Sequence, residues 1–213
     1  MSKKLFAEFL GTFTLIFLGA GAIVSGKADL AGVAFAHGLA IFVMVSAVGA
    51  ISGGHFNPAI SAAMLATKRI DIKDFAYYVG AQLVGASVAS FALNYIYGSG
   101  NGYGLPAISD GTSVGGGLLA EIIGTALLAF VIFGVAVDDR STYKKHAGLP
   151  IGLTITAIIF SVGPITGAAL NPARWFGPAI VSGDWSNTWV YILGPIAGAV
   201  IAALTYTSIA KPK

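Results

Sequence analysis

The chain has 213 residues and a formal net charge of +3; 56% of its residues are hydrophobic, only 10% are charged, and none is cysteine. Soluble domains carry about 25% charged residues, so the composition excludes an ordinary soluble domain and indicates a protein whose solvent is lipid. Without cysteine there is no disulfide framework or thiolate metal site, and the basic residues form no stripe that could follow a phosphate backbone, so no nucleic-acid partner is expected.

Six apolar segments are long enough to cross a bilayer, which takes about 20 residues. In chain order they are Leu5–Val24, Leu30–Ile51, Phe75–Tyr97, Leu118–Val137, Ala147–Pro164 and Trp189–Ile209. Two further segments, Pro58–Ala66 and Pro172–Val181, have only about half the necessary length. We expect both to be re-entrant, with protein or a water-filled cavity covering their ends. The predicted fold class is therefore an all-α membrane protein with six transmembrane helices plus two re-entrant half-helices.

The basic residues predict the orientation of these spans. Ten of them fall on one side of the topology: Lys3, Lys4, Lys68, Arg69, Lys73, Arg140, Lys144, Lys145, Lys211 and Lys213. The other side carries Lys27 alone, and Arg174 lies inside a half-helix. Because Lys and Arg are enriched in cytoplasmic loops, we expect both termini to be cytoplasmic in an integral protein of the cell (plasma) membrane.

Landmarks of the first half of the sequence return in the second half, 113 or 114 residues later. They are Glu8–Thr12 with Glu121–Thr125, and Asn57–Ala59 with Asn171–Ala173. Each half holds three spans, an odd number, so the second half must be inverted relative to the first. Such repeats with interrupted helices place the functional site at the midplane between them. We expect one domain, 1–213, with repeats of about 1–105 and 115–213.

Each half-helix begins with the triplet Asn-Pro-Ala. The six residues are Asn57, Pro58, Ala59, Asn171, Pro172 and Ala173. Asparagine is a favoured N-cap and proline suits the first helical position, so the amide oxygen accepts from the first turn while the amide NH2 is left as a donor. Half-helices that enter from opposite faces would meet with their positive dipole ends together. Water could pass there, whereas a cation would be repelled and a proton-conducting chain of waters interrupted.

Two segments with these triplets resemble the signature loops of aquaporins, the major intrinsic protein family. They are Ser-Gly-Gly-His-Phe-Asn-Pro-Ala-Ile-Ser at 52–61 and Gly-Ala-Ala-Leu-Asn-Pro-Ala-Arg-Trp-Phe-Gly-Pro at 167–178. The starts of the two halves, 7–12 and 120–125, are also similar to this family, and the resemblance covers essentially the whole chain. It implies the hourglass fold, a homotetramer with one pore in each protomer, and passive transport without enzyme activity, cofactor or metal.

Arg174 is costly inside an apolar segment unless it reaches water, a partner or a lumen. The resemblance implies that it is the cation-repelling arm of the selectivity filter, and that His37, Ile159 and Ala168 are the other filter residues. Orthodox water channels have phenylalanine and histidine at the first two positions, so this filter looks more like that of plant tonoplast intrinsic proteins, some of which also pass ammonia. We expect a widened filter in which His37 leans across the lumen and donates or accepts.

Three further polar residues are assigned to the support of the two loops. Glu8 and Glu121 occupy matching places in the halves, and similar glutamates in aquaporins accept from backbone N–H groups of the re-entrant loops. His55, two residues before Asn57, is expected to brace its loop with its ring and to turn its backbone carbonyl to the lumen.

The expected function is a passive channel that conducts water, with neutral ammonia as a second permeant, and excludes ions and protons; its partners are the lipid bilayer and small neutral solutes. Two alternatives stay open: a channel for glycerol or other small neutral solutes, and a proton-coupled secondary transporter that uses Glu8 and Glu121. Ala179 and Tyr191 match the water-conducting branch of the family, whereas Trp175 matches neither branch. An enzyme is not expected, because three scattered histidines offer no nucleophile with a base in reach.

Overall fold

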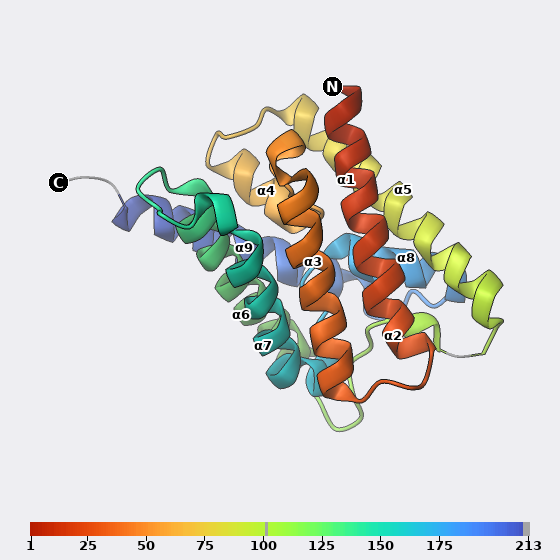
Figure 1. Cartoon of the computed structure of the whole chain (residues 1–213). Coiled ribbons are helices and arrows are strands. Elements are labelled where there is room, and N and C mark those ends of the chain that lie inside the picture. Colours follow the sequence, from red (N-terminus) through yellow and green to blue (C-terminus); the bar gives the residue numbers. More distant parts are fainter. Residues whose placement is uncertain (101, 211–213) are drawn as a thin grey trace.

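The computed structural model describes residues 1–100 and 102–210, and every regular element in them is a helix (Figure 1). Six helical stretches are long and apolar enough to cross a membrane: Ser2–Val24, Leu30–Ser52, Ile72–Tyr97, Val114–Val137, Gly148–Thr166 and Thr188–Ile209. The prediction of six spans in an all-α membrane protein is confirmed. Lys211 and Lys213, which entered the orientation argument, lie outside the described residues.

The spans are divided into the following elements. The first consists of α1 (Ser2–Thr14), a π-helical turn η1 (Leu15–Ala20) and α2 (Gly21–Val24). The next spans are α3 (Leu30–Ser52), α5 (Ile72–Tyr97), α6 (Val114–Ile132) with the π-helical turn η3 (Phe133–Val137), α7 (Gly148–Thr166) and α9 (Thr188–Ile209). Two short helices, α4 (Pro58–Ala66) and α8 (Pro172–Ser182), occupy the segments expected to be re-entrant, and the short 3-10 turns are η2 (Gly102–Gly104) and η4 (Lys144–His146).

Among the spans that begin earlier than the apolar pattern indicated, α5 and α6 are extended by polar caps. Helix α5 begins at Ile72 and not at Phe75, since the Asp71 side chain accepts a hydrogen bond from the Asp74 backbone N–H at 2.7 Å. Ser113 caps α6 in the same way. An N-cap satisfies one of the orphan N–H groups of a first turn, so each helix begins before the continuous apolar segment by which it was predicted.

Glycines allow the spans of each half to pack closely. A Cβ atom at Gly85 in α5 would lie 2.4 Å from the carbonyl oxygen of Phe9 in α1, and a Cβ at Gly198 in α9 would lie 2.2 Å from that of Ile122 in α6. A side chain at either position would overlap the neighbouring backbone, so only glycine allows these helices to approach so closely. Other membrane helix pairs have small residues at the crossing for the same reason. Helix α5 therefore lies directly against α1, and α9 against α6.

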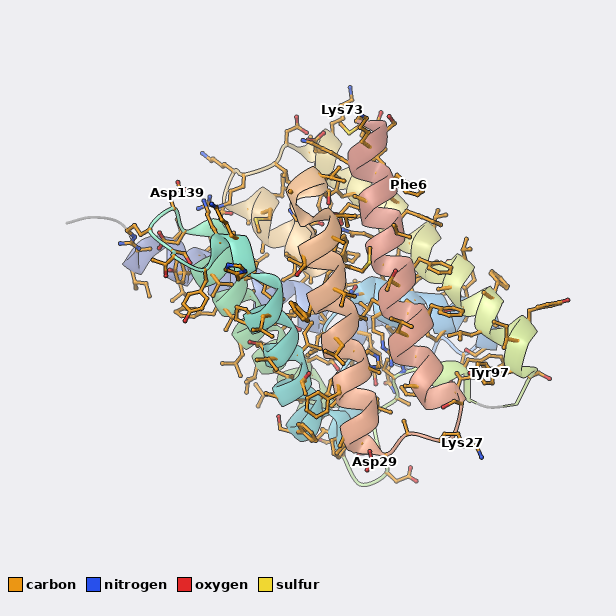
Figure 2. The ribbon with its side chains drawn as sticks, viewed as in Figure 1. Phe6, Lys27, Asp29, Lys73, Tyr97 and Asp139 are labelled. Atoms are coloured by element: carbon orange, nitrogen blue, oxygen red, sulfur yellow. The ribbon has the colours of Figure 1, made fainter. Side chains whose placement is uncertain are left out.

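The outside of the bundle is apolar and its charges gather at the two ends. Phe6 on α1 is 63% exposed and points away from the bundle (Figure 2). Figure 2 also shows Lys73 and Asp139 at one end of the bundle and Lys27 and Asp29 at the opposite end. An apolar belt between two charged ends is the surface that a bilayer requires.

Candidate functional site

A cavity of about 360 Å³ lies between the helices and takes its lining from both halves of the chain. It reaches from Asp139 and Lys144 to His37 and Arg174; Asp139 marks one end of the bundle in Figure 2. Corresponding positions of the two halves line it in pairs: Leu15 with Leu128, His37 with Ile151, Ile41 with Ile155, Val45 with Ile159, and Ile60 with Arg174. The lining positions in α3 and α7 recur every fourth residue, which is one face of a helix.

Both short helices begin at the cavity with the same N-terminal chemistry. Asn57 Oδ1 accepts from the Ala59 backbone N–H at 2.8 Å, and Asn171 Oδ1 accepts from the Ala173 N–H at 2.9 Å. Pro58 and Pro172 occupy the first turn of their helices, and both asparagines line the cavity. The structure thus places the N-terminal ends of α4 and α8 at one cavity, where their dipoles add to a positive potential.

The two asparagines also connect the loops that precede their helices. Asn57 Nδ2 donates to the carbonyl oxygen of Leu170 at 2.8 Å, and Asn171 Nδ2 donates to that of Phe56 at 2.9 Å. The sequence predicted that both amide NH2 groups are donors for the lumen; in the structure one N–H bond of each is used by a loop carbonyl. The reason is that a buried carbonyl oxygen needs a donor. Each asparagine retains one amide hydrogen for the cavity.

Glu8 fixes the backbone of the first loop, residues 53–57, which connects α3 with α4. Its carboxylate accepts from the N–H groups of His55 at 3.0 Å and Phe56 at 2.7 Å, and from Ser52 Oγ at 2.6 Å. Gln82 Nε2 donates to it as well, at 2.8 Å. Phe56 has φ +49°, a conformation that costs a non-glycine residue on the order of 1–3 kcal/mol and persists only where its surroundings fix it. The carboxylate supplies that fixation.

Glu121 fixes the backbone of the second loop, residues 167–171, which connects α7 with α8. It accepts from the N–H groups of Ala169 at 2.9 Å and Leu170 at 2.7 Å, and from Thr166 Oγ1 at 2.6 Å. Leu170, with φ +54°, corresponds to Phe56 of the first loop. Both glutamates are fully buried, and both accept hydrogen bonds from loop residues.

His55 is itself part of the first loop. Its Nδ1 is 3.0 Å from Ser61 Oγ, and its ring makes an edge contact with Tyr78 at a centroid distance of 5.0 Å. The ring is thus held between α4 and α5, and the residue also lines the cavity. These contacts are those of a residue that braces the loop.

Arg174 is 98% buried, and two acceptors hold its guanidinium group. Its Nε donates to His37 Nε2 at 3.1 Å, and its Nη1 donates to the carbonyl oxygen of Gly104 at 2.7 Å. Ile159 and Ala168 line the same cavity, so the structure brings together all four residues assigned to the filter. A guanidinium carries five N–H donors, and Arg174 lines the cavity with it.

The contacts of His37 define its tautomer. Arginine Nε can only donate, so His37 Nε2 is an acceptor; Val33 O, 2.9 Å from His37 Nδ1, can only accept, so Nδ1 carries the proton. Both ring nitrogens are occupied. In the structure Arg174 engages Nε2 and Val33 engages Nδ1, so neither ring nitrogen is left to donate or accept in the lumen, contrary to what the sequence had led us to expect.

Gly104 is the site residue that the sequence analysis missed. It lies in the turn η2 with φ +66°, and its backbone carbonyl is the second partner of Arg174. The only signal in the sequence is the run of glycines at 98, 100, 102 and 104, which indicates an unusual loop backbone but not its partner.

The end of the cavity near Asp139 carries paired charges. Lys144 Nζ donates to the Asp139 carboxylate, and this hydrogen bond lowers the pKa of that carboxyl. The Arg69 guanidinium lies 5.5 Å from the centre of the Phe133 ring. Across the described residues, 1–100 and 102–210, no three His, Asp or Glu side chains gather in a way that could hold a metal ion.

Comparison with known proteins agrees with this geometry. The model of the family described as major intrinsic protein matches residues 1–206. Aquaporin NIP1-1 of Zea mays is 42% identical over 212 residues, covering 97% of this chain and 74% of that protein. Glycerol uptake facilitator protein-like 6 of Lactiplantibacillus plantarum is 44% identical over 206 residues, covering 94% and 95%. The solved aquaglyceroporin from Plasmodium falciparum aligns with a TM-score of 0.89 at 28% identity, covering 98% of this chain and 96% of that one.

Proposed function

Because the chain belongs to the major intrinsic protein family, whose members are passive channels and not enzymes, we propose that it conducts water through the cavity, with neutral ammonia as a second permeant. One observation carries this proposal: the cavity is lined by Asn57, Asn171 and Arg174 between otherwise largely apolar walls. Few fixed donors in an apolar pore let water exchange hydrogen bonds without being held. We assign the filter to His37, Ile159, Ala168 and Arg174.

Exclusion of ions follows from the sign of the charges at the cavity. The N-terminal ends of α4 and α8 contribute partial positive charge, and Arg174 contributes a full one. A cation would lose its hydration shell against this field without gaining an acceptor. A water between Asn57 and Asn171 accepts from their free amide hydrogens, so its own hydrogens point outward and the chain of identically oriented waters needed for proton transfer is interrupted.

The test is a flux measurement on proteoliposomes. We expect osmotic water flux at least about tenfold above that of protein-free liposomes, equivalent to about 1.4 kcal/mol off the barrier, with a low activation energy and no dependence on a proton gradient. Stopped-flow traces for water, ammonia and glycerol on one preparation provide the readout. Flux of any of these solutes that follows an imposed proton gradient would instead support the transporter alternative.

A glycerol channel is the second candidate, and one observation favours it. Ile159 and Ala168 leave two sides of the filter apolar and without polar side chains, and one relative at 44% identity bears the name glycerol uptake facilitator protein-like 6. An apolar wall suits the carbon backbone of a polyol. Glycerol flux comparable with water flux in the same preparation would decide for this candidate.

A double substitution tests the filter assignment. His37→Phe with Ile159→His restores the residues of orthodox water channels and adds a polar side chain to the lumen. We expect water flux to persist within about threefold and ammonia flux to fall at least about tenfold, because one methylene in a fitted site already changes discrimination by roughly tenfold or more. The matched control is Ile151→Val, since Ile151 corresponds to His37 in the other half and lines the cavity away from the filter. Equal ammonia flux in both proteins and in bare liposomes overturns the ammonia claim alone.

We further propose that the channel is a homotetramer of the cell (plasma) membrane with both termini cytoplasmic, each protomer being one channel domain of two inverted repeats. The location of Lys73 and Lys27 at opposite ends of the bundle (Figure 2) supports this orientation. The orientation is measured by labelling lysines from outside intact cells: Lys27 should react, and Lys73 should be protected. The oligomeric state follows from the mass of the detergent-purified protein.

A further inference from the structure

The π-helical turn η1 (Leu15–Ala20) interrupts the first span at the height of the filter. Its last two residues pack against the two groups that hold Arg174. A Cβ atom at Gly19 would lie 2.5 Å from His37 Cδ2 and 2.7 Å from His37 Nε2. A Cβ at Gly104 would lie 2.9 Å from the Cβ of Ala20 and 3.1 Å from its carbonyl oxygen. Neither Gly19 nor Ala20 lines the cavity.

The second half also contains a π-helical turn, η3 (Phe133–Val137), but it begins only at Phe133, the position that matches Ala20. The residues that match 15–19 of the first half, from Leu128 to Ile132, still belong to the regular α-helix α6. The position that matches Gly19 is Ile132, which keeps its side chain and lines the cavity. π-Helical turns are rare and are found frequently at functional sites. In the first half the turn places a glycine, Gly19, where the imidazole ring of His37 stands.

We propose that Gly19 and Ala20 are positioning residues that set the aperture of the filter, an inference that rests on the proposed channel function. Gly19 lets the His37 ring withdraw against the first span, and Ala20 limits how far the Gly104 carbonyl can withdraw. Because these two groups accept from Nε and Nη1 of Arg174, the wall formed by η1 determines where the guanidinium lies. The width of the filter is therefore encoded partly in residues that no permeating molecule touches.

The first test is Gly19→Ala. The new methyl overlaps the His37 ring, which the Val33 bond holds on its other edge, so the ring must move into the cavity. We expect water flux to fall at least about tenfold, because one methyl group more or less in a fitted site changes discrimination by roughly tenfold or more. The matched control is Gly80→Ala in α5, because a Cβ at Gly80 would meet nothing within 4 Å; its flux should equal that of wild type.

A double-mutant cycle separates this role from a general packing defect. In a His37→Ala background there is no ring to displace, so adding Gly19→Ala should leave water flux unchanged, and coupling between the two sites would be measured directly. An equal loss in both backgrounds, or no loss in the wild-type background, overturns the proposal. The fold of each variant is checked by its elution from a size-exclusion column.

A gain of function covers the case in which Gly19→Ala fails to fold. Ala20→Gly removes the methyl that Gly104 would otherwise approach, so the carbonyl and Arg174 can withdraw and the filter widens. We expect the ratio of glycerol to water permeability to rise at least about threefold, a modest share of the selectivity that one methyl group can control. An unchanged ratio of glycerol to water permeability contradicts the inference. Absence of all neutral-solute flux in wild type would overturn the proposed function instead, so the two failures are distinguishable.

Discussion

Arg174→Val is expected to raise the cation and proton leak of the channel at least about tenfold, corresponding to the removal of about 1.4 kcal/mol from the barrier, while water flux persists. Arg174 lines the cavity, and its guanidinium donates to His37 Nε2 and Gly104 O. Valine removes this full positive charge and opens space beside the His37 ring. Only the dipole ends of α4 and α8 then oppose a cation, and each helix end is equivalent to about half an elementary charge.

The chain provides a matched control for this substitution. Ile60 follows Asn57 by the same three residues by which Arg174 follows Asn171, and it lines the same cavity without a charge. Ile60→Val should leave the leak at the wild-type level. The measurement is ion current in planar bilayers together with pH-dye decay in proteoliposomes. Potassium or sodium current through wild type, or an unchanged leak in Arg174→Val, contradicts the exclusion mechanism.

Glu8→Leu is expected to lower the free energy of unfolding by about 3 kcal/mol or more. Four groups donate to the carboxylate: the backbone N–H groups of His55 and Phe56, Ser52 Oγ and Gln82 Nε2. Each unpaired buried donor costs about 1–3 kcal/mol, although hydrogen bonds measured in membrane bundles average only about 0.6 kcal/mol. Glu8→Leu leaves several donors unpaired at once, next to a backbone that adopts φ +49° at Phe56. The summed cost is therefore larger than that of any single hydrogen bond. A drop in the melting temperature of the detergent-purified protein measures this effect.

Two further variants define the role of the carboxylate. Glu8→Gln keeps an acceptor oxygen but turns an NH2 group toward donors, so its stability should fall between those of wild type and Glu8→Leu. Asp29 is the matched control, since its exposed carboxylate accepts from a single backbone N–H, that of Gly32 at 2.8 Å; Asp29→Ala should cost about 1 kcal/mol or less. A fully stable Glu8→Gln protein that loses a proton-driven flux would favour the transporter alternative.

The sequence by itself determined the spans and the starts of the half-helices, because both depend on local properties. Apolar length reports whether a segment can cross a bilayer, and Asn-Pro at the start of α4 and α8 specifies a cap from adjacent residues alone. The fold class follows from these local signals. Even the boundary differences at Asp71 and Ser113 are local, since each arises from a side chain that caps its own helix.

The tertiary structure alone decided how the filter is held. His37 and Arg174 are 137 residues apart in the sequence, and Gly104 and Arg174 are 70 apart. No local pattern reports which acceptors a buried arginine will find, and therefore none reveals the tautomer of His37. The amide of Asn57 is a similar case, since its partner Leu170 belongs to the other half of the chain. These choices are made when the helices pack, because every buried polar group must then find a partner among the groups that packing brings within reach.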